Sequence, residues 1–562
     1  MRVALLTEGG YPFAQGESVA WCDRLLHGLP EHEFDVLALS RFSRQERGPR
    51  RPPPGNVREV RTAPLWGAPR GIGAPPGAPR AWARVSCGLA RRFAASFAEL
   101  AAALCPGDHA PGQARSRPQA DRFADGLYGL ADLAAAHGGL GTWLRSEDAV
   151  RVLEAVCRAR HAPRAVRGAR AADLLAVADR LERALRPLSL DWYGRAGGPG
   201  PRDLSHAVGT GPAALAGLVA RHRHGTPLLI TEYGARLRDH HLANGAGPGA
   251  HADAFPAGLG TAAAAHAVAG PGGVAPVRAL LAAFRVRLAR EAYRGAALIT
   301  PGDSAARRRR EAQGAGPGWP RTVRPEPGAG LFRAVAGGRP PAAPPTLVRV
   351  GRAEPDQELD WLLRVFQDVR AAEPAARLLV VGAPARGRAE TGHLARCRAL
   401  AARLFPSRGK PSPVTFTEVG TAEVPTLADA YAGGGVVVRC GAARGYPPAL
   451  IEAMLRARAI VSTDTGAVVE AVGDTGLVVP HGDRAAFAAA CVSLLRDPAR
   501  GARLGAAARA RALDLFSVER DAAAFAAVYR EVGHEGVAAR AGAAARAGLE
   551  PIRAATAGRE PA

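Results

Sequence analysis

The sequence predicts an α/β protein of two domains, each a doubly wound parallel β-sheet covered by helices, facing each other across a cleft. Three observations lead to this fold class. The chain has 562 residues, 47% of them hydrophobic, so it is too long for one core and apolar enough for two. Short apolar runs alternate with segments of helical periodicity in two separate blocks, which is typical of parallel sheets. Between the blocks, AGGRPPAAPP (336–345) is predicted to be a linker.

The first block, residues 1–335, opens with a strand, a helix and a second strand. RVALLTEGG is predicted to be a buried strand that ends in a glycine turn, and FDVLALS is the next strand. Between them, SVAWCDRLLHGL is predicted to be a helix, because its apolar residues recur at helical spacing: Val19, Cys22, Leu25, Leu26 and Leu29. Residues 44–80 are rich in Pro, Gly and Arg, so we expect an irregular loop there.

The rest of the first block is expected to be mainly helical until two more strands complete its sheet. Residues 93–190 are Ala-rich with a helical pattern, and DLSHAVGTG is predicted to be a loop. The remaining elements are the helix GPAALAGLVARHRHG, the strand PLLITEYG, the helix PVRALLAAFRVRLAREAYRG and the strand AALITPG. Residues 243–273 have the composition of a disordered segment.

The second block, residues 346–535, repeats the alternation. Its predicted strands are TLVRVGR, RLLVVGAP, VTFTEVG, GVVVRCG, AIVSTDTG and GLVVPHGD. The helix after the first strand has one apolar face, made of Leu359, Leu362, Leu363, Phe366 and Val369. VPTLADAYAGG and PALIEAMLRAR are further helices, and residues 536–562 are expected to be a free tail.

The charge and the aromatic content bear on possible partners. The net charge is +23, yet the chain has a single lysine, Lys410, and the excess of arginine runs through the whole sequence. Only 5% of the residues are aromatic, so no stacking platform accompanies the basic residues and nucleic acid is not an expected partner. Peripheral contact with an anionic membrane surface stays open, for example through Arg307–Arg310, whose alternative is a solvated helix face.

The cysteines and the N-terminus indicate a cytoplasmic protein. Seven cysteines lie scattered without a C-x-x-C pair, which argues against a disulfide framework or a zinc site. MRVALLTEGGYPF is an apolar run too short for a signal peptide. No uninterrupted apolar run reaches the ~20 residues that cross a bilayer.

Candidate binding residues follow the predicted strands of the second block. Parallel strands end at one edge of their sheet, where ligands of such folds bind. Arg352 follows the first strand, and a guanidinium there would bind phosphate oxygens. Glu452 lies near the start of a helix, where its carboxylate can accept hydrogen bonds from vicinal hydroxyls such as those of a ribose. Thr465, Gly466 and Ala467 form a tight turn that would present backbone amides.

The order of these residues resembles glycosyltransferase family four, retaining enzymes of the GT-B fold. RGYPPALIEAM (444–454) is similar to the family's E-x7-E stretch, written EGFPxxxxEAM, and STDTGAVVEAVGDTGLVVPHGD is similar to the segment downstream. Three N-terminal segments resemble the branch that acts in Pel-type exopolysaccharide synthesis, whose N-terminal region is a domain of unknown function. They are EGGYPFAQGESVAW, DLSHAVGTGPAALAGLVARHRHGTPLLITEYGARLR and EAYRGAALITPGDSAARRRREAQGA.

The resemblance implies that a sugar is transferred from a nucleotide sugar, expected to be a uridine diphosphate (UDP) sugar, to a glycan or lipid-linked acceptor. It implies no metal and no cofactor, because the family holds the diphosphate with an Arg and a Lys. Carried over by position, Arg352 binds the diphosphate, Glu452 binds the ribose, and Gly16 belongs to the N-terminal glycine loop. The turn from Thr465 to Val468, which includes Gly466 and Ala467, lies beside the diphosphate.

Three residues are candidates for the chemistry itself. His206 corresponds to the cleft histidine of the family, with a satisfied structural histidine as the alternative. Glu232 is assigned to polar contacts on the acceptor side, as a base or as a loop carboxylate. Arg444 stands where the family has the first Glu of E-x7-E, and it would contact the diphosphate or the donor sugar.

The chain departs from the family pattern at several positions. The family's Lys falls on Gln357, its first Glu on Arg444, and the second glycine of its N-terminal loop on Glu17. Its Glu-His pair reads Glu232–Tyr233. Two interpretations follow. Either Arg444 replaces the cation that is missing at Gln357, or the chain is a catalytically silent relative that serves as a binding or assembly component.

Overall fold

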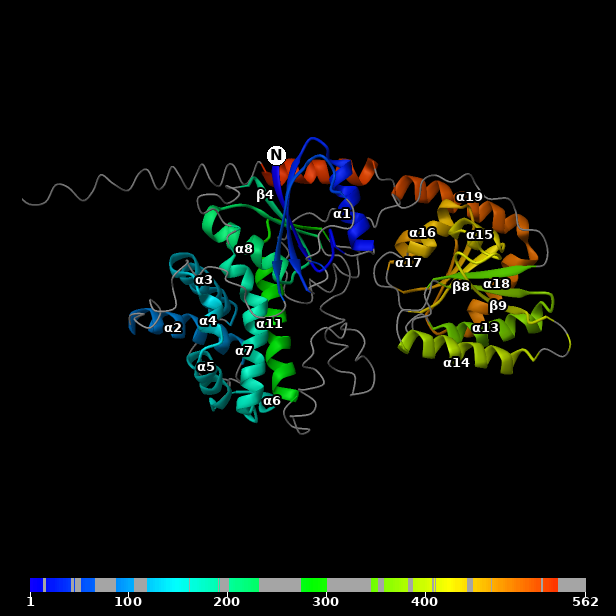
Figure 1. Cartoon of the computed structure of the whole chain (residues 1–562). Helices are drawn as coiled ribbons and strands as arrows, with labels where there is room; N and C mark the ends of the chain where they lie inside the picture. The colour runs from blue at the N-terminus through cyan, green and yellow to red at the C-terminus, as the bar shows by residue number, and fades with distance from the viewer. Residues whose placement is uncertain are drawn as a thin grey trace, which may run out of the picture. The chain divides into compact units, whose positions relative to one another are not determined.

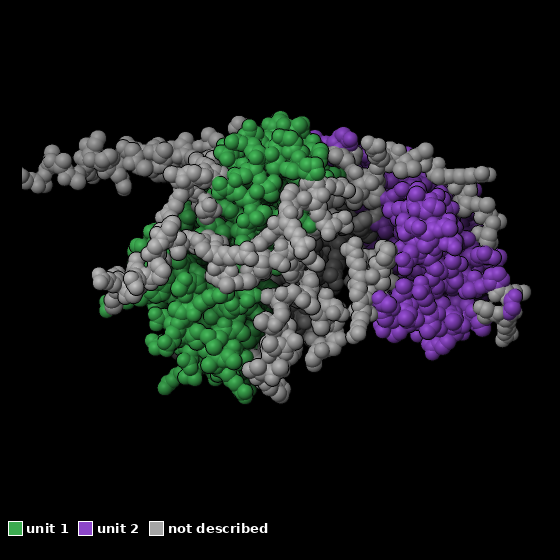
Figure 2. All heavy atoms as spheres, in the orientation of Figure 1, with its two compact units in different colours: residues 1–300, 310–323, 524–562 green, residues 301–309, 324–523 purple. Residues whose placement is uncertain are grey.

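The computed structural model of the chain contains two compact units, each built on a six-stranded parallel β-sheet (Figure 1). The predicted α/β fold class is thereby confirmed. The first unit comprises the described residues up to 300 together with 524–533, and the second comprises 345–516 and 519–523 (Figure 2). The structure describes residues 1–13, 17–41, 45, 52–65, 87–105, 119–160, 162–190, 192, 202–231, 274–300, 345–351, 358–382, 388–406, 409, 411–441, 448–465, 467–516 and 519–533.

The first sheet is wound outward in both directions from its first strand. In spatial order its strands are β3 (Val57–Pro64), β2 (Glu33–Ser40), β1 (Arg2–Glu8), β4 (Leu204–Val208), β5 (Leu228–Thr231) and β6 (Leu298–Thr300). The register pairs Leu5 of β1 with Val36 of β2 on one side and with His206 of β4 on the other. The DLSHAVGTG segment, predicted to be a loop, therefore contains the fully buried strand β4. The apolar pattern did not predict this strand, because Ser205 and His206 interrupt its apolar run.

Helices cover both faces of the first sheet. They are α1 (Glu17–Gly28), α2 (Cys87–Leu104), α3 (Gln119–His137), α4 (Leu140–Leu144), α5 (Glu147–Arg158), α6 (Arg164–Arg167), α7 (Ala171–Leu185), the 3-10 helix η3 (Arg186–Ser189), α8 (Pro212–His224) and α11 (Val274–Gly295). Alternate residues of β1 enter two different cores, as the pleat of a strand requires. Ala4 and Leu6 pack in the core shared with α2 to α8 and α11, while Val3 and Leu5 pack in the core shared with α1. Figure 1 shows α2 to α7 gathered beside α11.

A helical segment from the end of the chain, residues 519–533, completes the second of these cores. Phe525, Val528, Tyr529 and Val532 are buried there with Trp21 of α1. Residues 524–533 thus belong to the first unit, whereas the sequence placed the boundary of the second domain at residue 535. The packing of this segment against the first unit is a tertiary interaction, so the local helical pattern of the sequence does not predict it.

The second sheet has the same winding. Its strands, in spatial order, are β12 (Leu477–Val479), β11 (Ala459–Thr463), β10 (Val436–Arg439), β7 (Thr346–Val350), β8 (Arg377–Gly382) and β9 (Val414–Glu418). The helices are α13 (Leu359–Ala372), α14 (Arg388–Leu404), α15 (Leu427–Ala432), α16 (Pro448–Leu455), α17 (Val468–Val472), α18 (Arg484–Arg496) and α19 (Pro498–Leu515). One core joins α13, α14 and α18 to one face of the sheet, and another joins α16, α17 and α19 to the opposite face (Figure 1).

The five apolar residues predicted for one face of α13 are all buried in the first of these cores. The predicted linker, residues 336–345, lies outside the described residues except for Pro345, and so does the predicted free tail, 536–562. Within the described part of the chain, no helix combines the length and the apolar character needed to span a bilayer.

Candidate functional site

Each sheet has one switch point, where the strand order reverses and the loops on either side diverge. The first lies between β1 and β4, and the second lies between β7 and β10. In open parallel sheets, ligands bind at the carboxyl ends of the strands beside such a point. Gly351 directly follows β7 with a φ of +143°, and Gly441 lies two residues after β10 with a φ of +88°. These backbone conformations favour glycine, so both turns beside the second switch point depend on it.

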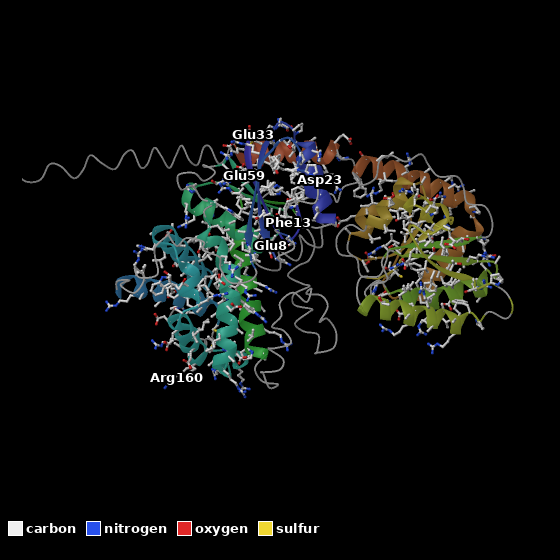
Figure 3. All side chains as sticks on the ribbon, viewed as in Figure 1. Glu8, Phe13, Asp23, Glu33, Glu59 and Arg160 are labelled. Carbon is white, nitrogen blue, oxygen red and sulfur yellow. The ribbon has the colours of Figure 1, made fainter. Side chains whose placement is uncertain are left out.

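The first switch point already holds an anion that the chain itself provides. Glu8 ends β1 and is only 8% exposed, and Figure 3 shows it at the opposite end of the sheet from Glu33. Nε of Arg41, the residue after β2, donates to its Oε1 at 3.0 Å. Its other oxygen, Oε2, lies so close to Gly211 that a Cβ there would approach to 2.6 Å. Because Gly211 caps the N-terminus of α8, the carboxylate also lies where a helix dipole stabilises negative charge.

Arg285 of α11 adds a further cation to the surroundings of Glu8. The pKa of its guanidinium is lowered to about 10, chiefly by burial; the charge of Glu8 opposes this shift, and the charges of Arg41 and Arg180 add to it. Glu8 is therefore a structural counterion at this edge of the first sheet. A second anion at the same position would have to displace a carboxylate that is already held by Arg41 and the start of α8.

The structure places His206 in the core of the first unit, which corrects the expectation that it contacts a substrate. Its side chain is 0% exposed. Nδ1 lies 2.7 Å from the hydroxyl of Tyr529, and Nε2 lies 2.7 Å from the hydroxyl of Thr231. Thr231 Oγ1 in turn lies 2.6 Å from Thr300 Oγ1. Burial lowers the pKa of His206 to about 3, so the ring is neutral and both of its nitrogens are used in structural hydrogen bonds.

Glu452 is positioned as a buried carboxylate on α16 with one oxygen unused. The side chain is 3% exposed. Its Oε1 forms an ion pair with Arg456, one turn further along the helix, and Arg456 lies over the ring of Tyr431 at 5.4 Å from the centroid. Among the described residues, Oε2 has no hydrogen-bond partner. A buried carboxylate oxygen without a donor is costly, so Oε2 is suited to accept a hydrogen bond from a ligand hydroxyl.

The turn that begins at Thr465 is tied to the end of β10. Thr465 Oγ1 donates to the carbonyl of Gly441 at 2.8 Å. The amide of Val468 donates to the carbonyl of Thr465 at 3.3 Å, so this one of the predicted phosphate-facing amides is used inside the turn. The side chains of Ala467 and Val468 are fully buried in the core with α16 and α19. Gly466 lies outside the described residues.

Two arginines at this edge of the second sheet were not predicted as site residues from the sequence. Arg349 lies within β7, is 4% exposed, and donates from Nη1 to the carbonyl of Gly351. Arg439 is the last residue of β10, and its Nη1 lies 3.5 Å from Thr465 Oγ1. Both sit beside the second switch point. The signal that could have found them is a lone cation in an otherwise apolar strand, as in TLVRV and VVVR.

The remaining predicted residues lie outside the part of the chain that the structure describes. They are Gly16, Glu232, Tyr233, Arg352, Gln357 and Arg444, whereas Glu17 is the first residue of α1. Chain connectivity alone relates two of them to the second switch point: Arg352 follows Gly351, and Arg444 comes three residues after Gly441.

Two doubly wound sheets of this kind define the GT-B fold of glycosyltransferases, in agreement with the predicted fold class. Two family matches divide the chain in the same way. Residues 1–318 match the family described as Domain of unknown function (DUF3492), and residues 344–497 match Glycosyl transferases group 1. Because the first match spans more than half of the 562 residues, the chain belongs to the DUF3492 family. Its second unit contains a glycosyltransferase group 1 domain.

Solved structures share this fold at low sequence identity. Sucrose-phosphate synthase from Thermosynechococcus elongatus is similar with a TM-score of 0.51 and 18% identity, over 94% of this chain and 98% of that chain. Anabaena Alr3699/HepE in complex with UDP is similar with a TM-score of 0.50 and 13% identity, over 94% and 100% of the two chains.

Curated relatives match over a shorter stretch. D-inositol 3-phosphate glycosyltransferase of Rhodococcus opacus (strain B4) is 34% identical over 185 residues, and that of Rhodococcus erythropolis is 34% identical over 186 residues. Each match covers 32% of this chain and 40% of the relative. The chain therefore spans less than half the length of these relatives.

Acidification is predicted to weaken the first unit through His206. In the folded protein the pKa of His206 is lowered to about 3, against 6.5 for an exposed histidine. Above 6.5 the ring is neutral in both states, whereas between 6.5 and about 3 only the unfolded state takes up the proton. The free energy of unfolding should therefore fall by ~1.4 kcal/mol for each pH unit in this window.

Urea unfolding of wild type and of His206→Gln at several pH values measures this slope. The substitution should remove the contribution of His206, while His137→Gln, at an exposed histidine that ends α3, should leave the slope as in wild type. If His206→Gln lost stability with falling pH as steeply as wild type, the buried neutral ring would not be the cause.

Proposed function

We propose that this chain is a retaining glycosyltransferase that transfers a hexose from a UDP-sugar to a glycan or lipid-linked acceptor, without a metal or a cofactor. The observation that carries the proposal is that the second unit holds Glu452, with its unused Oε2, and also the cations Arg349 and Arg439 on the two strands of its switch point. A nucleoside diphosphate offers the complementary groups, namely ribose hydroxyls and phosphate oxygens.

In this reaction the protein contributes mainly substrate binding and electrostatic stabilisation. The bond between the anomeric carbon and the diphosphate breaks, and a bond to the acceptor hydroxyl oxygen forms. The departing nucleoside diphosphate gains negative charge, so cations fixed beside it stabilise the transition state more than the bound donor. Arg352 and Arg444, which follow the two strands of the switch point, would add to Arg349 and Arg439 there.

The sequence resemblance to the Pel-type branch supports a place in exopolysaccharide synthesis, with the protein in the cytoplasm and in peripheral contact with the membrane. The names of the similar proteins are consistent with a nucleotide-sugar substrate. One neighbour was solved with UDP, and the Rhodococcus relatives are named as glycosyltransferases. The neutral Gln357 and the reversed charge at Arg444 favour the second candidate, a silent relative that binds nucleotide without transferring sugar.

A turnover experiment separates the two candidates. The purified chain is incubated with each UDP-sugar and a set of glycan acceptors, and released UDP is measured together with the anomeric configuration of the product. We expect UDP release and a product that retains the configuration of the donor. Arg352→Ala and Arg444→Ala should each lower turnover by about 100-fold, because each removes a preorganised group at the diphosphate.

Arg377→Ala is the matched control, because Arg377 is an exposed arginine at the amino end of β8 in the same sheet. UDP binding without turnover on any donor would favour the silent relative. Unchanged binding and turnover in Arg444→Ala would contradict the replacement of the missing cation by Arg444.

Glu452 should make the affinity for the nucleotide depend on the ribose hydroxyls. Wild type is predicted to bind UDP about 10-fold more tightly than 2′-deoxy- or 3′-deoxy-UDP, because a hydroxyl bound to a buried carboxylate is lost. Glu452→Gln should lose most of this preference, measured as the ratio of the two dissociation constants by calorimetry. The ratio is the readout because the substitution also leaves Arg456 without its partner and lowers stability.

Glu423→Gln, at an exposed loop glutamate of the same unit, should keep the wild-type ratio. The assignment of Glu452 to the ribose would be wrong if Glu452→Gln still distinguished the deoxynucleotides as strongly as wild type.

A further inference from the structure

Arg439 reaches across the carboxyl edge of the second sheet. It is the last residue of β10 and lies in register with Ser462 of β11. Its Nη1 is 3.5 Å from Oγ1 of Thr465, which is three residues beyond Ser462 and past the end of β11. The guanidinium thus extends along the strand direction to the edge of the sheet, where the loops after β7, β10 and β11 begin.

The hydroxyl of Thr465 positions this guanidinium. Thr465 Oγ1 gives its proton to the carbonyl of Gly441 at 2.8 Å, so the lone pairs of the oxygen are what it can offer to Arg439. A guanidinium carries five N–H groups in a rigid fork, and one contact with a hydroxyl orients the whole fork. The β10 backbone fixes the other end of the side chain. Arg439 is therefore held in place before a ligand arrives.

Two carboxylates on described residues near this edge have other partners. Glu358, at the start of α13, lies 2.9 Å from Nε2 of His481. Glu452 forms its ion pair with Arg456. Arg349, buried in the neighbouring strand β7, adds a second positive charge close to the switch point. At the first sheet, by contrast, the carboxylate of Glu8 already lies among the arginines at the equivalent position.

We propose that Arg439 binds the diphosphate of the nucleotide-sugar donor and supplies the cation that the neutral Gln357 lacks, while Thr465 acts as a positioning residue for its guanidinium. This inference rests on the proposed function and names a residue that the family pattern did not point to. Because Arg439 belongs to a strand of the core sheet, its guanidinium loses little conformational entropy when a ligand binds.

The contact is specific for phosphate, and this makes it testable. Arg439 would interact with the charged part of the ligand and with no part of the nucleoside. Removing it should weaken binding of UDP and leave binding of uridine unchanged. A variant that merely distorted the site would weaken both ligands together, because the ribose and the phosphates bind to one connected set of loops.

The experiment is calorimetry of the full-length chain with UDP and with uridine as probes. Arg439→Gln is expected to bind UDP about 10- to 100-fold more weakly, the size of one charge-assisted hydrogen-bonded pair, with uridine affinity as in wild type. Thr465→Val, which keeps the charge but frees the guanidinium, should weaken UDP binding several-fold. Arg377→Gln, at the amino end of the same sheet, is the matched control and should bind both ligands as wild type does.

Failure of the inference and failure of the proposed function give different results. If wild type binds UDP and Arg439→Gln binds it equally well, or loses UDP and uridine in equal proportion, the role of Arg439 is overturned. If wild type binds neither ligand, the proposed function fails and the inference fails with it. Should Arg439→Gln not fold, as judged by circular dichroism, Arg439→Met, which removes the charge and keeps an unbranched side chain, decides. Weaker UDP binding with unchanged uridine binding supports the role of Arg439, and unchanged UDP binding overturns it.

Discussion

The reversal of strand order in each sheet is the constraint on which the rest of this structure depends. It places the carboxyl ends of β1 and β4 side by side in one unit and those of β7 and β10 side by side in the other. The two positions differ in the charged side chains at the strand ends. At the first, the carboxylate of Glu8 is held by Arg41 and the start of α8, and at the second, Arg349 and Arg439 are cations. A diphosphate is therefore expected at the second position.

Buried polar groups define the first unit as a scaffold. Tyr529, His206, Thr231 and Thr300 form a chain of short hydrogen bonds from the C-terminal helical segment through three adjacent strands. Each group in such a chain is costly to leave unpaired, so the segment is anchored in one register as well as by its apolar contacts. The sequence around His206 resembles that of a site residue, but in the structure its side chain holds the core of the first unit together.

The sequence predicted the fold well where apolar periodicity dominates, as in β1, β2, α13 and the strands of the second sheet. It missed β4, because Ser205 and His206 break the apolar pattern and the ring of His206 is satisfied by partners far along the chain. It also placed residues 524–533 in the wrong unit, since the packing of Phe525 and Tyr529 against Trp21 is a tertiary contact. For the candidate site, Glu452 and Thr465 were predicted from their place after the strands and from the family resemblance. Arg349 and Arg439 were missed because a cation inside a strand matches no family motif.

The central claim, that a nucleoside diphosphate binds at the switch point of the second sheet, is tested most directly by hydrogen–deuterium exchange of the full-length chain with and without UDP. The account predicts slower exchange in peptides that contain the ends of β7 and β10, the start of α16 and the turn at Thr465, with the ends of β1 and β4 unchanged. Protection confined to the first sheet, or no protection at saturating UDP, would contradict it.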